Sequence, residues 1–298
     1  MSLKNILHLI SLGALWGASY LFIRLSIDEF GPVLIAELRL LIAAILIGLF
    51  LFLNPARRTH LIIQSREWGR FMVVGIFNSA LPFCLIAFAM GNLTAGMGAI
   101  LNSTAPIWGS LVAYVWLQEK LSKWQMLGLL LGVLGVFVLV GDSTAFDFSG
   151  QFLNPIAVLV ATLSYGASAS YIKRYCADLS ALKMTFGSML MGAFVLMPLA
   201  YYFWPEVPIS LNAWLAVLGL GAFSTAYAYV MYFRLIEEIG PAKAISSTFL
   251  IPVFGMLLGE LFLNESITLR MIAGGVIILL GTAMSVGVMK VFYNQPNS

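Results

Sequence analysis

The stretch from Asn102 to Glu119, NSTAPIWGSLVAYVWLQE, is an apolar run with a Pro and a Gly in its middle and a carboxylate at its end. The same pattern returns 146 residues further on. That shift aligns six Pro, Gly and Glu positions: Pro106 with Pro252, Gly109 with Gly255, Glu119 with Glu265, Gly128 with Gly274, Gly135 with Gly281 and Gly141 with Gly287. Apolar composition alone would not align these residue types, so the chain contains an internal repeat in two copies.

The composition around this stretch is that of a membrane protein. Of the 298 residues, 61% are hydrophobic and 10% are charged, whereas a soluble domain has roughly 25% charged residues. Apolar runs of about 20 residues recur, each long enough to cross a hydrocarbon core as a helix. A β-barrel would instead show short alternating segments. We therefore expect an all-α integral membrane protein.

Turn residues and charges divide the apolar sequence into ten expected spans. They cover approximately residues 5–25, 32–53, 68–90, 93–117, 124–141, 153–173, 181–203, 212–234, 242–262 and 269–289. The two copies define a first five-helix repeat over 1–141 and a second over 153–291, joined by an extracytoplasmic linker over 142–152.

The basic residues predict the orientation of the spans. With the N-terminus inside, all 16 Lys and Arg residues except Arg24, Arg39 and Arg270 fall on the inner side. Such a bias is typical of cytoplasmic loops and predicts that both termini are cytoplasmic. Because these residues sit in short loops, the net charge of +3 does not indicate binding to nucleic acid.

Five spans in each copy force the second copy to run upside down. The N-terminal parts of the two copies also match, since Trp16 to Ser19 (WGAS) aligns with Tyr165 to Ser168 (YGAS). Inverted repeats are typical of secondary transporters, with the substrate site near the midplane between the halves. A structural membrane protein does not need this symmetry.

Paired polar and aromatic positions in the two copies are the candidate substrate-binding residues. The pairs are Trp16 with Tyr165, Ser19 with Ser168, Asn78 with Ser224, and Asn102 with Thr248. We expect them, with Tyr20 and Trp108, to line a central cavity. The alternative is that the small polar side chains join helices to one another. Other aromatic residues, Tyr229 and Tyr232 among them, are expected to be packing residues or interfacial anchors.

Two charges and two prolines complete the candidate set. Glu37 and Arg39 lie inside the second expected span, where Glu37 is either a protonatable coupling group or a structural charge that reaches outward. Pro106 and Pro252 should each remove a helix hydrogen bond and produce a kink. The kinks would act as gating hinges or would only shape the cavity.

An enzyme is not expected. The two histidines, His8 and His60, are both near the cytoplasmic side, which excludes a site built from several His ligands. The sequence contains no GxSxG elbow, Walker loop or dinucleotide fingerprint, so we expect no catalytic residue, metal or cofactor.

The whole chain resembles the drug/metabolite transporter superfamily, in particular the ten-span exporters built from two EamA-type repeats. The matching segments are WGASYLFIR at 16–24, ELRLLIAA around Arg39, LNSTAPIWG at 101–109, and the tails of both copies from 118 and 264. The resemblance implies export of amino acids, related metabolites or drugs across a bacterial inner membrane. It also implies that spans five and ten stand apart from the cavity and support a homodimer. Four-span multidrug relatives use a Glu in their first span, which this chain lacks.

Together these features predict an exporter of small amphipathic metabolites, amino acids first among them, that works by alternating access. The alternative within transport is a broad-specificity efflux transporter for drugs or cations, for which Glu37 is the support. A membrane scaffold or membrane enzyme is the alternative from another class.

Overall fold

A computed structural model describes residues 2–141 and 152–286, and within these ranges the chain is entirely helical. Eight helical segments are long and apolar enough to cross a membrane, and Leu269–Ser285 is a shorter apolar helix. The expectation of an all-helical membrane protein is confirmed. The span expected over 93–117 differs from its neighbours, because it consists of two short helices, Ala95–Asn102 and Ala105–Trp116.

The first half of the chain forms seven α-helices with three short irregular helices between them. In order they are α1 (Leu3–Arg24), α2 (Ile27–Leu53), η1 (Pro55–Leu61), η2 (Ser65–Glu67), α3 (Trp68–Gly75), η3 (Ile76–Ala80), α4 (Leu81–Met90), α5 (Ala95–Asn102), α6 (Ala105–Trp116) and α7 (Lys123–Val140).

The second half repeats the order of the α-helices, without counterparts of η1 and η2 and with a 3-10 segment, η6, before α13. It comprises α8 (Leu153–Tyr175), α9 (Ala181–Tyr202), α10 (Leu211–Gly221), η5 (Ala222–Tyr227), α11 (Ala228–Ile239), α12 (Pro241–Ala244), η6 (Ile245–Leu250), α13 (Ile251–Leu263) and α14 (Leu269–Ser285). The linker expected over 142–152 lies outside the described residues except for Phe152, and so does the end of the second repeat from 287 onward.

The irregular helices of the two halves match in position. Segments η3 and η5 are π-helical and begin 146 residues apart, at Ile76 and Ala222. A π-helical turn adds a residue to the helix and is frequent at functional sites. The two turns place Asn78 and Thr225 near the middle of their spans.

Pro106 follows a break between α5 and α6, so the kinked continuous span expected there is wrong, whereas at Pro252 the 3-10 segment η6 runs directly into α13. Each lies in the first turn of a new helix, Pro106 in α6 and Pro252 in α13. In a first turn the missing N–H costs no internal hydrogen bond. The prolines therefore mark helix starts within an apolar run.

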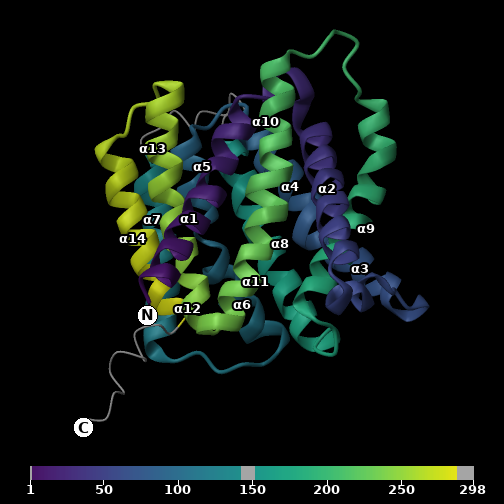
Figure 1. Ribbon diagram of the computed structural model, residues 1–298. Helices are drawn as coiled ribbons and strands as arrows, with labels where there is room; N and C mark the ends of the chain where they lie inside the picture. Colours follow the sequence, from purple (N-terminus) through teal and green to yellow (C-terminus); the bar gives the residue numbers. More distant parts are fainter. Residues whose placement is uncertain (1, 142–151, 287–298) are drawn as a thin grey trace.

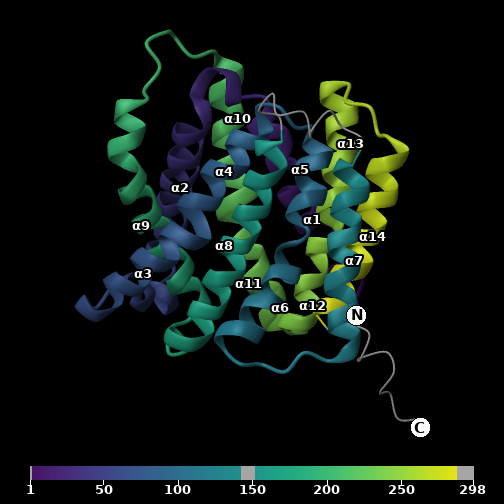
Figure 2. The same cartoon turned by 180° about the vertical axis from the view of Figure 1, so that it is seen from behind.

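Matched helices of the two halves point in opposite directions (Figure 1). The short helix α6 ends at the bottom of the view, and its counterpart α13 ends at the top. Helices α7 and α14 lie side by side at one edge in both views (Figures 1 and 2). Their close approach depends on glycines, since a Cβ at Gly281 would lie 2.6 Å from the backbone nitrogen of Gly132.

Candidate functional site

One cavity of about 470 Å³ lies between the two halves of the molecule, within the size range of small-molecule sites. Its lining brings together nine of the residues predicted from the sequence: Trp16, Ser19, Tyr20, Arg39, Asn78, Asn102, Pro106, Tyr165 and Thr248. Helices α1, α2, α5, α6 and α8 and segments η3 and η6 supply them. Neither α7 nor α14 contributes a lining residue.

Five other predicted residues lie elsewhere. Trp108 lines a separate apolar hollow of about 510 Å³ between α6, α7 and α8. Ser168 and Ser224 are buried, and their hydroxyl oxygens have no hydrogen-bond partner among the described residues. Glu37 and Pro252 are also buried outside the lining.

Tyr229 and Tyr232 are cavity residues that the sequence reasoning assigned to packing. Both contact Trp16, Tyr229 edge to face with ring centroids 6.2 Å apart and Tyr232 at a tilt with ring centroids 5.3 Å apart. Their spacing of three residues on α11 puts them on one helix face, a signal that the sequence does contain. With Tyr20 and Tyr165 they give the cavity an aromatic wall with four phenolic hydroxyls.

Arg39 is the one charged residue in the lining of this cavity. It is buried, with only 8% of its surface exposed. Its Nε donates a 2.9 Å hydrogen bond to Thr225 Oγ1, and its guanidinium carbon lies 3.8 Å from the centre of the Phe83 ring. The Thr225 hydroxyl donates in turn to the carbonyl of Leu220, which fixes its lone pairs toward Arg39.

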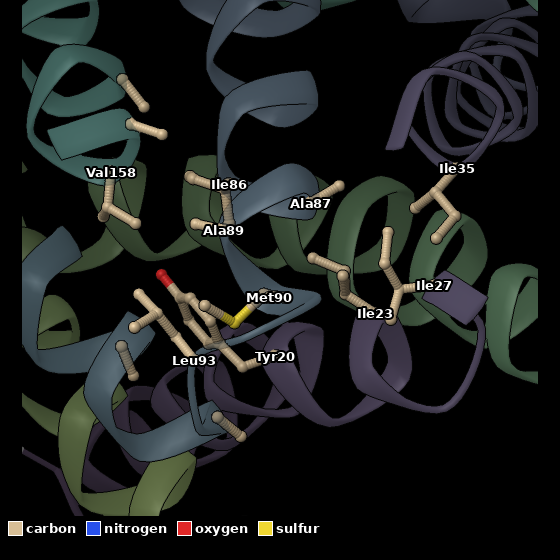
Figure 3. Close-up of a cluster of buried hydrophobic side chains, with 14 of the residues drawn as sticks. Tyr20, Ile23, Ile27, Ile35, Ile86, Ala87, Ala89, Met90, Leu93 and Val158 are labelled. Carbon is tan, nitrogen blue, oxygen red and sulfur yellow. The ribbon is translucent and has the colours of Figure 1, made fainter. Parts of the chain in front are cut away.

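A buried apolar cluster seals one end of the cavity. Tyr20, Ile23, Ile86, Met90 and Leu93 belong to it, and Figure 3 shows them between the ends of α1 and α4. Each is less than 9% exposed. Buried side chains therefore fill this end of the cavity.

A polar clasp lies beyond the seal. Arg24 donates a 2.8 Å hydrogen bond to the carbonyl of Met90 and lies 3.4 Å from Glu265. The Arg24–Glu265 contact is an ion pair without hydrogen-bond alignment, since neither of its facing atoms has a hydrogen-bond partner. Glu265 also accepts a 2.8 Å bond from the backbone N–H of Ala95. The clasp thus joins α1, α5 and the end of α13.

The opposite end of the cavity is open. Pro106 and Gly109 line both the cavity and a second hollow that reaches Glu119 and Lys120. Glu119 pairs there with Lys173 at 2.6 Å. In the aligned copies this pair is the counterpart of Glu265 with Arg24, but Glu119 is 45% exposed whereas Glu265 is 10% exposed.

Two aligned glycines show the same asymmetry. A Cβ on Gly255 would lie 2.5 Å from Ala99 Cβ, because α13 packs closely against α5 at the sealed end. A Cβ on Gly109 would meet no atom nearer than Gly166 Cα at 4.0 Å. The same surface is therefore packed in one half and open in the other.

An apolar helical bundle that encloses one site between two matched, oppositely directed halves defines a membrane transporter. The sequence model of the EamA-like transporter family matches the chain twice, over residues 3–141 and 154–287. The chain belongs to this family and is a multi-pass membrane transporter, not an enzyme.

Curated relatives align over nearly their whole length. The Bacillus subtilis protein called uncharacterized transporter YoaV is 26% identical over 95% of this chain and 96% of its own. The Escherichia coli K12 protein called uncharacterized inner membrane transporter YedA is 25% identical, with 94% and 90% covered. A crystal structure described only as that of a protein shares the fold, with a TM-score of 0.66 at 17% identity and 96% and 98% coverage.

Proposed function

We propose that the protein exports small amphipathic metabolites, amino acids first among them, by alternating access between two inverted repeats. The observation that carries this proposal is the cavity sealed at the Glu265 end and continuous with a hollow at the Glu119 end. Inverted halves can exchange these two conformations by a rigid-body movement of one half against the other. The cavity would then face each side of the membrane in turn.

The orientation supports export from the cytoplasm. The open end carries Lys120 and Lys173, which the distribution of basic residues assigns to the inside. We infer a state open to the cytoplasm in a protein of ten spans with both termini inside. The printed description of YedA as an inner membrane transporter supports the bacterial inner membrane as the location.

Efflux of cationic drugs is the weaker alternative. A cation site requires negative charge or acceptor groups, but the described residues that line the cavity include no Asp or Glu and one Arg. Glu37, the support for this alternative, lies outside the lining. A homodimer through the edge formed by α7 and α14 remains a proposal that rests on the family resemblance.

Transport in proteoliposomes tests the proposed function. We expect uptake or counterflow of at least one radiolabelled amino acid or related metabolite by the purified protein. Trp16→Ala and Asn102→Ala should each lower the rate at least about tenfold, since each removes part of the cavity wall. No transport of any compound tested, or wild-type rates in both variants, would contradict the proposal.

A further inference from the structure

Arg39 is a buried charge whose protein partners do not neutralise it. Its described contacts are the Thr225 hydroxyl and the Phe83 ring. Neither is an anion, and Arg39 has no carboxylate within ion-pair distance among the described residues. Glu37 is two positions away on α2, and residues at that spacing do not face each other on a helix.

The terminal nitrogens of Arg39 are free to bind a ligand. Its hydrogen bond uses Nε alone, and Nη1 and Nη2 are not among the enclosed polar atoms that lack a partner. They therefore open onto the cavity that Arg39 lines. A guanidinium held at Nε and stacked on a ring presents its remaining donors in a fixed fork, which matches the two oxygens of a carboxylate.

The rest of the lining fits the other parts of such a ligand. Tyr20, Tyr165 and Tyr229 line the cavity with Arg39, and their hydroxyls have no hydrogen-bond partner among the described residues. They can donate to a second oxygen. The remaining wall is largely apolar or aromatic, with Trp16, Ile23 and Ile251 in it, and it suits an apolar body rather than a bare inorganic ion.

We propose that the transported molecule carries a carboxylate that binds Arg39 as its counter-ion, with its apolar body against the aromatic wall. The substrates are then carboxylates or zwitterions, and amines without a carboxylate are excluded. This inference rests on the proposed function only in taking the cavity as the substrate site. The buried charge gives the reason for selectivity: an ionised group in low dielectric gains most from a partner of opposite charge.

Matched ligands test the inference on the unmodified protein. The probes are phenylacetate, phenylacetamide and phenethylamine, with 4-methylpentanoate, its amide and isoamylamine as an aliphatic set. Binding is measured as a shift of the unfolding temperature in detergent. We expect each carboxylate to bind at least about tenfold more tightly than its amide, as for a charged hydrogen bond, and the amines to give no shift.

Variants separate Arg39 from a general effect of charge. In Arg39→Gln the preference for the carboxylate over the amide should fall to near one, and in Arg39→Lys it should be intermediate, because an ammonium lacks the fork. Arg66→Gln removes the same charge from an exposed position outside the cavity and should keep the wild-type preference. If Arg39→Gln does not fold, the wild-type ligand sets and Arg39→Lys still decide.

Several results would overturn the inference. They are an amine that binds as tightly as its carboxylate, a full preference for the carboxylate in Arg39→Gln, and no protection by any carboxylate. The transport assay separates this result from the proposed function. Carboxylates that bind through Arg39 but are not moved would overturn the function alone, and substrates moved equally well by Arg39→Gln would overturn the inference alone.

Discussion

Single residues decide how tightly each end of the cavity is closed. Glu265 is 10% exposed, caps the N-terminus of α5 through Ala95 and faces Arg24. Glu119 occupies the aligned position in the other half, where it is 45% exposed beside Lys173. A partly buried carboxylate with a backbone donor contributes more to stability than an exposed ion pair, whose median value is about 0–1 kcal/mol.

The two carboxylates should respond differently to the same substitution. Glu265→Gln is expected to lower the free energy of unfolding by about 1–3 kcal/mol, since it leaves Arg24 without its anion in a partly buried site. Glu119→Gln should change it by no more than about 0.5 kcal/mol. Thermal unfolding in detergent measures both. Equal losses of unfolding free energy in the two variants would contradict the difference in closure between the two ends of the cavity.

The pairing of aligned residues predicted much of the cavity, and its failures have a local cause. Trp16, Asn78, Asn102 and Tyr165 line one cavity as expected, because both copies keep a polar or aromatic group there. Ser224 is buried outside it. Asn78 and Ser224 are each the third residue of a π-helical turn, so the helical period does not separate them. Ser224 is instead fully covered by local packing, with 0% exposure, and the pairing of aligned residues does not encode that packing.

At the scale of helices, small residues set which pairs can approach. Gly281 on α14 faces the backbone of α7, with the nitrogen of Gly132 and the carbonyl oxygen of Gly128 at 2.6 and 2.7 Å from the position of a Cβ. A methyl group there must push backbone away. A Gly→Ala substitution causes no clash where the glycine faces open space, as at Gly69.

Gly281→Ala should therefore separate α7 from α14. We expect a loss of about 1–3 kcal/mol in the free energy of unfolding, typical of overpacking, and a lower unfolding temperature in detergent. Gly69→Ala is the matched control, and it should leave the temperature unchanged or raise it, because Ala favours the helix. An unchanged temperature in Gly281→Ala would contradict the packing described.

The helix starts at Pro106 and Pro252 show what sequence reasoning missed at this scale. An apolar run with a Pro was expected to be a kinked span, but a proline has no N–H for the carbonyl four residues earlier and its ring clashes with that carbonyl, which favours a helix end there. The helix α5 consequently ends at Asn102, and α6 begins at Ala105. Tertiary packing, which the run itself does not encode, decides whether such a site becomes a kink or a break.

Gly109 should matter for transport although it touches little in the described conformation. If the two halves exchange conformations, Gly109 takes the place that Gly255 holds now. It would then pack against Ile245, which lies 146 residues beyond Ala99 and is its aligned counterpart, as Gly255 packs against Ala99 now. We expect Gly109→Ala to keep the wild-type unfolding temperature and ligand binding but to lower the transport rate about tenfold or more, since overpacking disfavours the other state by about 1–3 kcal/mol. A wild-type rate would contradict this prediction.

At the scale of the whole molecule, the two ends of the cavity are expected to open and close in opposite senses. The seal around Tyr20 and Met90 and the open hollow at Glu119 belong to matched parts of oppositely directed halves. Alternating access requires that opening one end closes the other. Two independent mouths would not give this coupling, and neither would a static cavity.

Spin-label distances in Gly255→Ala test this relation most directly. One label pair, at the exposed positions Lys120 and Lys243, reports on the open end, and a second, at Asn92 and Ser266, reports on the sealed end. The added methyl group clashes with Ala99 in the described conformation, and we expect the exchanged conformation to relieve this clash. We predict that the distances at Lys120–Lys243 shorten while those at Asn92–Ser266 lengthen. A change at one end alone, or the same direction of change at both ends, would contradict alternating access between the two halves.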